Sequence, residues 1–308
     1  MTTPIKEILP REVPKNIVPT LKLFSDQLDE FVNFGTHIMY WDVNPKTNGE
    51  ENIAPTMLFR HFLDLIDSVS ILVEHGCGDT PKLLMRGALE VTLGIEYLFE
   101  KDTNDRAMAF LVVEILNEIK VLKKLNPKTN EGTQLHELLK KEGLLPNFTP
   151  NDKYNLNDEV LSKEKILQLP KFQKAFKEYE QLLANKEANP KWYRFYGGPK
   201  NVEALSLYLK QKTLYELLYR KWSGTVHGSD VYLGRLLNNS EGGVDIIQLR
   251  FIKDVQEVVR FAMTLSLIVF KAYIDNRIPE KEQDSAMWYM TIRDKYLLIT
   301  QTNMIIVE

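Results

Sequence analysis

Apolar residues recur at every third or fourth position along most of this chain, and that spacing limits the possible folds more than any other feature of the sequence. A period near 3.6 is that of one face of an α-helix, whereas a strand alternates with a period of two. The segments that follow the helical period are residues 21–40, 56–74, 81–99, 106–125, 163–183, 202–222 and 246–274. The sequence therefore predicts an all-α protein built as a multi-helix bundle.

Turn residues separate several of these helices. Gly76 is typical of a helix end, and Thr80 followed by Pro81 is typical of an N-cap and a first turn. Residues 56–99 are therefore predicted to form a helical hairpin. Two strand-like runs near the carboxyl end predict a small C-terminal β-hairpin, at 296–299 and 304–307.

The same pattern divides the chain into three predicted segments. Residues 1–55 are expected to be an N-terminal helical arm, residues 56–278 a helical core domain, and residues 279–308 a C-terminal extension. Within the core domain, residues 126–164 are poor in apolar side chains and rich in Asn, Lys, Glu and Pro. We interpret that stretch as a partly ordered polar excursion.

Charge and cysteine content exclude some classes of protein. A net charge of −3 gives no reason to expect a nucleic-acid coat protein, although it leaves room for a local basic surface. The single cysteine, Cys77, excludes an internal disulfide and fits a reducing compartment. Residues 1–20 lack an apolar signal segment, and the apolar run 261–270 is too short to span a bilayer. We expect a cytoplasmic protein with no membrane partner.

The sharpest chemical signal lies in residues 219–229. Arg220 and His227 are seven residues apart, so a continuous helix would bring them to within about 20° of one face, with Ser223 on a neighbouring line. A permanently charged guanidinium beside an imidazole that titrates near neutrality suits phosphate-ester chemistry. Arg220, Ser223 and His227 are therefore the candidate catalytic residues.

A second constellation lies in the predicted helix 81–99. Arg86 and Glu90 are four residues apart among mainly apolar neighbours, which predicts that both are buried and paired. In one interpretation they form a salt bridge that fixes helix register. In the other, Glu90 orients Arg220 or His227.

Residues 202–222 offer a similar apolar face with a polar constellation, so we expect this helix to pack against the helix 81–99. Residues 191–222 also hold seven basic and two acidic side chains, with aromatic residues between them. Cations beside rings are typical of single-stranded RNA binding. The helically spaced aromatic residues of 215–222 instead favour a core position. The loop 192–200 is predicted to be exposed, and the candidate RNA-binding residues are Trp192, Arg194, Lys200 and Lys221.

No motif indicates a metal or a cofactor. The sequence has no phosphate-binding glycine loop, no Gly-x-Ser-x-Gly elbow and no His-Glu-x-x-His pair. His75, Cys77 and Asp79 are better explained as part of a turn between helices. We therefore expect no metal and no cofactor.

Arg86-x-x-x-Glu90, then Trp192, then the block Tyr219-Arg220, Ser223 and His227 resemble a large family of uncharacterised, mostly bacterial all-helical proteins over residues 56–232. More remotely, Arg220-x6-His227 is similar to the Arg-x(4–6)-His signature of the HEPN superfamily. Its members are helical nucleotide-binding and ribonuclease domains of toxin, phage-defence and CRISPR systems.

The resemblance implies a HEPN-like bundle that cuts RNA without a metal, as the effector of a toxin or phage-defence system with a cognate antitoxin or defence partner. In that role His227 would act as general acid or base, Arg220 would stabilise charge on the phosphorane, and Ser223 would bind a phosphate oxygen. The supporting residues would be Arg86, Glu90 and Tyr219.

The resemblance also implies a homodimer. The run 261–274 has almost no polar face, so we expect one layer of neighbours not to cover it. The alternative to an enzyme is a non-catalytic helical protein that binds a nucleotide or a partner, in which Arg220, Ser223 and His227 are structural. Exposure separates the two, because a catalytic group must line an open site.

Overall fold

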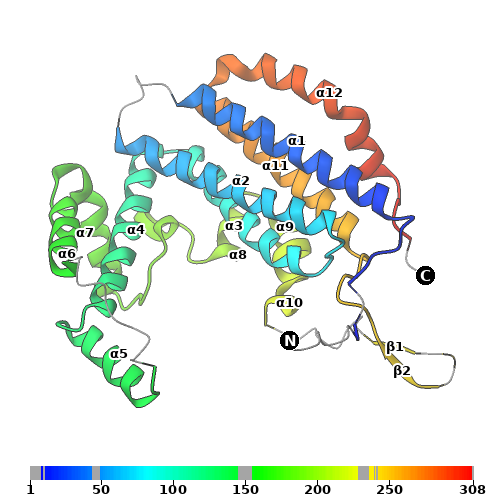
Figure 1. The fold of residues 1–308 in the computed structure, drawn as a ribbon. Coiled ribbons are helices and arrows are strands. Elements are labelled where there is room, and N and C mark those ends of the chain that lie inside the picture. Colours follow the sequence, from blue (N-terminus) through cyan, green and yellow to red (C-terminus); the bar gives the residue numbers. More distant parts are fainter. Residues whose placement is uncertain are drawn as a thin grey trace. The chain divides into compact units, whose positions relative to one another are not determined.

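The computed structural model describes residues 8–9, 11–43, 49–144, 155–227, 236–238, 240 and 242–306. Nearly all the regular structure of these residues is helical (Figure 1), which confirms the predicted all-α fold. The chain forms two compact units. Unit 1 comprises Met1–Asn48, Pro55–Lys101 and Val202–Glu308, and unit 2 comprises Gly49–Ala54 and Asp102–Asn201. These bounds differ from the three segments predicted, because helices from both ends of the chain pack together in unit 1.

Long helices make up most of unit 1. They are α1 (Val18–Asp42), α2 (Ile53–Glu74, whose first two residues belong to unit 2), α3 (Thr80–Glu100), α11 (Val255–Arg277) and α12 (Glu282–Gln301). Figure 1 shows α1, α11 and α12 side by side, and α11 also packs on α3. The shorter elements are α8 (Val202–Tyr208), α9 (Lys212–Leu214), the π-helical turn η4 (Tyr215–Arg220), α10 (Ser223–His227), β1 (Leu236–Asn238), β2 (Val244–Ile246) and the 3-10 turn η5 (Pro279–Lys281).

Helix α11 forms the centre of the unit 1 core. Its side chains at Met263, Leu265, Val269 and Phe270 are almost completely buried by helices of the same chain. The expectation that this run lacks cover within one chain is therefore wrong, and it no longer argues for a second copy.

The structure corrects several predicted boundaries. Residues 296–299 lie inside α12 and not in a C-terminal hairpin. The antiparallel pair is instead β1 with β2, in the register Leu236 with Ile246 and Asn238 with Val244. The predicted helix 202–222 is divided into α8, α9 and η4, and the helix predicted from 246 begins only at Val255.

Glycines allow the close turn between α2 and α3. Gly76 has a φ of +71°, in the left-handed region that favours glycine. A Cβ on Gly78 would lie 2.4 Å from the carbonyl oxygen of Phe251, so no side chain fits there. Pro81 occupies the first turn of α3, where its missing N–H costs nothing.

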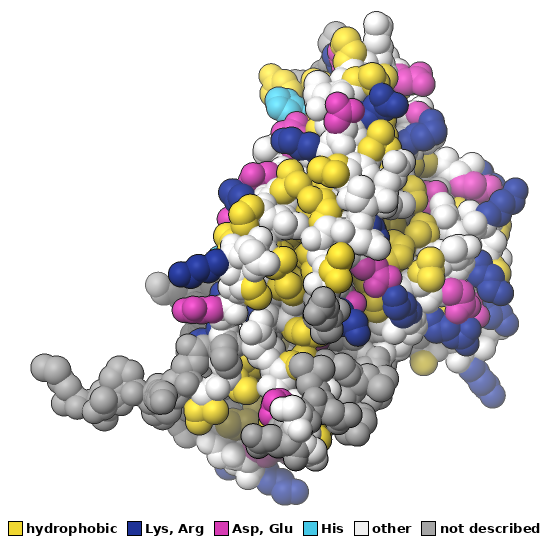
Figure 2. Space-filling model, turned by 90° about the vertical axis from the view of Figure 1, so that its right-hand side faces the viewer, with side chains coloured by type: hydrophobic (Ala, Val, Ile, Leu, Met, Phe, Trp, Pro, Cys, Tyr) yellow, Lys and Arg dark blue, Asp and Glu magenta, His cyan; other side chains and the backbone are white. Residues whose placement is uncertain are grey.

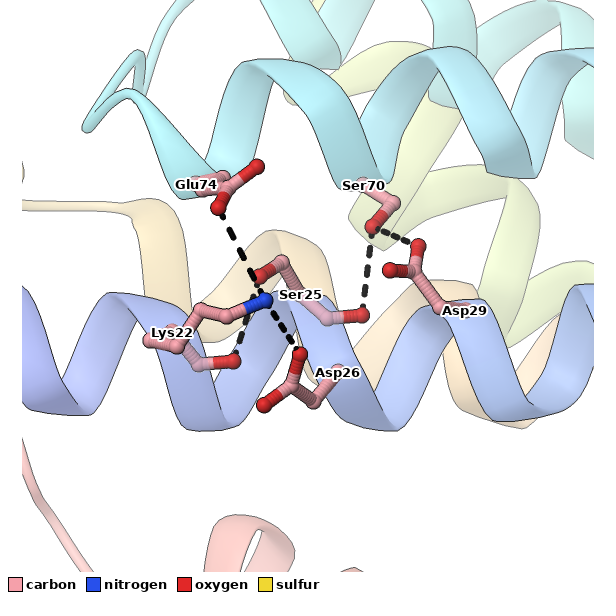
Figure 3. Close-up of polar contacts among 6 residues, drawn as sticks. All are labelled: Lys22, Ser25, Asp26, Asp29, Ser70 and Glu74. Atoms are coloured by element: carbon pink, nitrogen blue, oxygen red, sulfur yellow. Dashed lines mark hydrogen bonds and ion pairs between the residues drawn. The ribbon is translucent and has the colours of Figure 1, made fainter.

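Polar contacts fix α1 to its neighbours. Figure 3 shows Ser70 of α2, whose hydroxyl donates to Asp29 Oδ1 at 2.5 Å and to the carbonyl of Ser25 at 3.2 Å. At the end of α1, the buried carboxylate of Asp42 accepts from the Tyr273 hydroxyl at 2.6 Å and from Arg277 Nη2 at 2.9 Å. Burial, followed by the hydrogen bond to Asp42, raises the pKa of Tyr273.

Unit 2 is helical as well. It contains the 3-10 turn η1 (Glu50–Asn52), α4 (Thr103–Leu125), α5 (Asn130–Lys141), α6 (Leu156–Leu167), α7 (Pro170–Ala184) and the 3-10 segment η3 (Trp192–Gly197). Helix α4 contacts each of the others. The predicted excursion 126–164 contributes α5 and much of α6, and the Thr129 hydroxyl caps α5 by accepting from the Gly132 amide at 3.1 Å. No helix in the described part of the chain is long and apolar enough to cross a bilayer.

Candidate functional site

The candidate site is built on the contact between α3 and the segment 202–222. The rings of Tyr97 and Tyr208 meet at 5.7 Å, and Gln211 Nε2 donates to Glu96 Oε1 at 3.1 Å. Farther along, the guanidinium carbon of Arg86 lies 4.0 Å from the centre of the Tyr219 ring. Because these contacts occur in opposite order along α3 and along 202–222, the two segments run antiparallel. The prediction that they pack together is confirmed.

The turn η4 sets the directions of the next side chains. Its π-helical hydrogen bond runs from the Lys221 amide to the Glu216 carbonyl at 3.0 Å. Trp222 points inward, with 3% of its surface exposed, and packs edge-on against Phe261 at 5.6 Å. Buried Trp222 thereby anchors the block that begins at Arg220.

Arg220 points outward, with 64% of its side chain exposed. Its Nη1 donates to both carboxylate oxygens of Glu216, at 3.1 and 3.3 Å. This hydrogen bond to Glu216 raises the pKa of Arg220, which therefore stays charged. The arginine meets the exposure expected of a catalytic group, and Glu216 is a neighbour that the sequence analysis missed. The spacing of four between Glu216 and Arg220 could have indicated it.

Ser223 and His227 are the first and last residues of α10, which contacts α3. Ser223 is partly exposed. The side chain of His227 lies outside the described part of the structure, so its approach to Arg220 stays a prediction.

Arg86 and Glu90 do not form the buried pair that their spacing predicted. Glu90 is exposed, and Arg86 makes no ion pair with it in the described part of the chain. Arg86 instead lies on the face of Tyr219, whose ring stacks on that of Tyr215 at 5.2 Å and 17°. The tertiary contact with η4 takes the guanidinium away from the neighbour on its own helix.

The other cations of these elements have carboxylate partners. Lys221 Nζ lies 2.6 Å from Glu257, and the buried Lys82 Nζ lies 2.8 Å from Asp79 and 2.5 Å from Asp254. Burial lowers the pKa of Lys82, but the hydrogen bonds to Asp254 and Asp79 outweigh burial and raise it overall. Acidic side chains also lie among the basic ones on the face in Figure 2, with hydrophobic side chains exposed between them.

The loop proposed for RNA contact lies in unit 2, and its rings are buried except for that of Tyr196, which is exposed. Trp192 is only 9% exposed and packs edge-on against Phe110 at 5.8 Å, so the prediction of an exposed ring is wrong for this residue. Arg194 donates from Nε and Nη2 to Glu187, and from Nη1 to the carbonyl of Gly198 at 3.1 Å. These contacts explain Arg194 as a brace of its own loop. Lys200 is exposed.

Glu96 is a second residue that the sequence analysis missed. Burial raises the pKa of its carboxyl, and the hydrogen bond from Gln211 only partly offsets that rise. Its position among the apolar residues of α3 could have indicated a buried carboxyl group. In the described residues, no group of three or more His, Cys, Asp or Glu side chains is placed to hold a metal ion.

The candidate site lies within the part of the chain that matches a known protein family. The model of a family of unknown function (DUF5677) matches residues 52–244. That span contains α3, η4 and α10, and it is close to the span 56–232 over which the sequence resembles an uncharacterised family. Neither the curated proteins nor the solved structures gave a match.

Proposed function

Since the chain belongs to DUF5677, a family of unknown function, we propose an activity from its own residues: metal-independent cleavage of RNA at the block of Arg220, Ser223 and His227. The exposure of Arg220 carries the proposal. This guanidinium extends into solvent from η4, on the same short stretch as Ser223 and His227. A guanidinium sealed inside the unit could not meet a phosphate.

The chemistry proposed is transesterification. His227 takes the proton of the ribose 2′-hydroxyl, and the 2′-oxygen bonds to phosphorus. The bond from phosphorus to the 5′-oxygen breaks, and a protonated imidazole returns a proton to that oxygen. Arg220 stabilises the charge of the phosphorane, because its planar guanidinium binds both non-bridging phosphate oxygens at once, and Ser223 donates to one of these oxygens. The products are a 2′,3′-cyclic phosphate and a 5′-hydroxyl.

The remote similarity to HEPN proteins supports the biological setting that we propose. The protein acts in the cytoplasm as a homodimeric effector of a toxin or phage-defence system, held in check by a cognate antitoxin or defence partner. A homodimer would supply two copies of His227, one as base and one as acid.

The test is digestion of total RNA by the purified protein in EDTA. We expect the wild type to cleave and His227→Ala and Arg220→Ala to lose activity. His61→Ala and Arg293→Ala are matched controls, because both replace exposed residues on other helices of unit 1. Equal cleavage by all variants, or none by the wild type, contradicts the proposal.

One observation favours the alternative, a non-catalytic protein that binds a nucleotide or a partner. Arg220 already forms an ion pair with Glu216, and Lys221 forms one with Glu257. If these pairs are permanent, the block holds elements together and does no chemistry. Nucleotide binding by a wild-type protein that leaves RNA intact would select this alternative.

A further inference from the structure

Within the described part of the chain, Arg86 differs from the other cations of the α3, η4 and α10 neighbourhood because it has no carboxylate partner. The paired cations are Lys82 with Asp79 and Asp254, Arg220 with Glu216, and Lys221 with Glu257. Among the described residues, Nη1 of Arg86 is buried and has no hydrogen-bond partner. Buried donors without acceptors are rare in native proteins and call for an explanation.

The contact that Arg86 does make leaves its donors unused. The guanidinium lies over the Tyr219 ring, 4.0 Å from its centre, and uses its flat face for this cation–π contact. All five N–H groups of a guanidinium lie in its plane and point outward from its edge. The edge of Arg86 therefore stays available for an acceptor. Because the side chain is partly exposed, an acceptor can reach it from solvent with a small shift of the group.

The surroundings indicate what that acceptor is. The planar donors of arginine match the oxygens of a phosphate. Beside Arg86, the partly exposed rings of Tyr215 and Tyr219 are stacked on each other and can continue a stack with an unpaired base. The same turn ends at Arg220 and leads into α10.

We propose that Arg86 is a phosphate-binding residue, which takes a backbone phosphate of single-stranded RNA against the Tyr215 and Tyr219 pair. This inference rests on the proposed function, since it assigns a binding subsite next to the block of Arg220. Arg86 thereby becomes a residue that contacts the substrate and does not merely support Arg220 from behind.

Binding can be measured apart from cleavage. The probe is a labelled 2′-O-methyl RNA oligonucleotide, which has phosphates and bases but no 2′-hydroxyl to attack. Fluorescence anisotropy gives its dissociation constant for wild type, Arg86→Met and Arg86→Lys, and inorganic phosphate is added as a competitor. Arg293→Met is the matched control, because Arg293 is an exposed arginine of α12 in the same unit.

We expect Arg86→Met to weaken binding about tenfold or more, as expected for the loss of a charge-assisted hydrogen bond. Its melting temperature should stay close to that of the wild type, because removal of an unpartnered buried donor offsets loss of the cation–π contact with Tyr219. Arg86→Lys should bind with intermediate strength, since it keeps the charge without the planar edge. Arg293→Met should bind like the wild type.

Several results would overturn the inference. The first is unchanged binding of the oligonucleotide by Arg86→Met, and the second is loss of the fold of this variant. The third is a wild type that does not bind the oligonucleotide, even if it binds inorganic phosphate. The proposed function fails separately. If the wild type binds the oligonucleotide through Arg86 but never cleaves unmodified RNA, the subsite stands and the nuclease does not.

Discussion

At the scale of single residues, the environment of Arg86 shows why spacing along a helix is a weak guide to pairing. A salt bridge between residues four apart on an exposed helix face contributes about 0.3–0.5 kcal/mol. A cation–π contact contributes about 0.5–2 kcal/mol, the more so as it is shielded from water. The guanidinium of Arg86 therefore contacts the ring of Tyr219 and not the carboxylate of Glu90, which stays in solvent. No pattern within residues 81–99 predicts the contact of Arg86 with Tyr219, because Tyr219 comes from another part of the chain.

Glu96 supplies a pH-dependent prediction at the same scale. Burial raises the pKa of its carboxyl above the ordinary value of 4.5, so the folded state holds this proton more tightly than the unfolded state. By linkage, the charged carboxylate of Glu96 therefore lowers the free energy of unfolding. This loss is absent below pH 4.5 and grows until the pH exceeds the raised pKa. We expect Glu96→Gln to raise the melting temperature at neutral pH, and the gap to close as pH falls to 4.5. A variant that melts earlier than wild type at neutral pH would contradict this assignment.

At the scale of helices, the sequence predicted the long amphipathic ones and missed α12. Apolar residues of 282–301 do not form one clean stripe, and only Ile292 and Ile299 are fully buried. The short apolar run 296–299 therefore predicts a strand, because periodicity alone does not distinguish a short strand from part of a helix. Likewise, the π-helical turn η4, which ends at Arg220, leaves no pattern that a period of 3.6 can detect. The inward direction of Trp222 is also not readable from this segment, because its partner Phe261 lies far along the chain.

The attachment of α12 to α11 yields the next prediction. The buried amide of Gln256 donates to the carbonyls of Ile299 and Thr302, at 2.9 and 2.6 Å, and accepts from the amides of Met304 and Ile305. Arg260 also donates to both carbonyls, so Gln256→Ala leaves only the Met304 and Ile305 amides without their acceptor. We expect a loss of about 1–3 kcal/mol in unfolding free energy. Urea denaturation measures it.

The control for this change is Gln283→Ala on the exposed side of α12, which should stay within about 0.5 kcal/mol of wild type. If both variants unfold alike, the end of α12 is not held by Gln256.

At the scale of the whole molecule, the residues that the family model matches do not include all the helices that pack around the candidate site. The match to residues 52–244 omits α1, α11 and α12. Yet α3, which carries Arg86, packs on α11, and α11 packs on α1 and α12. The sequence predicted the helices of this core and the contact of α3 with 202–222. It did not predict that both ends of the chain join one unit, because such long-range pairing leaves no periodic signal.

Truncation tests this dependence. A chain that ends at residue 244 lacks α11, so the buried face of α3 that packs on α11 loses its cover. We expect it to bind a hydrophobic dye and to lose its near-ultraviolet circular dichroism. A chain that ends at residue 278 keeps α11 and loses η5, α12 and the residues that follow, and it should remain folded with lower stability. Cooperative unfolding of the shorter chain, equal to that of the longer one, would show that α11 is dispensable.

If the block of Arg220, Ser223 and His227 cuts RNA by transesterification, as we propose, the chemical ends of the RNA products will reveal it. One defined RNA is incubated in EDTA with wild type and with His227→Ala, and the fragments are analysed by mass spectrometry. We expect 2′,3′-cyclic phosphate and 5′-hydroxyl ends from the wild type, and intact RNA from the variant and from the 2′-O-methyl substrate. Intact RNA with the wild type, or identical fragments with His227→Ala, would contradict it.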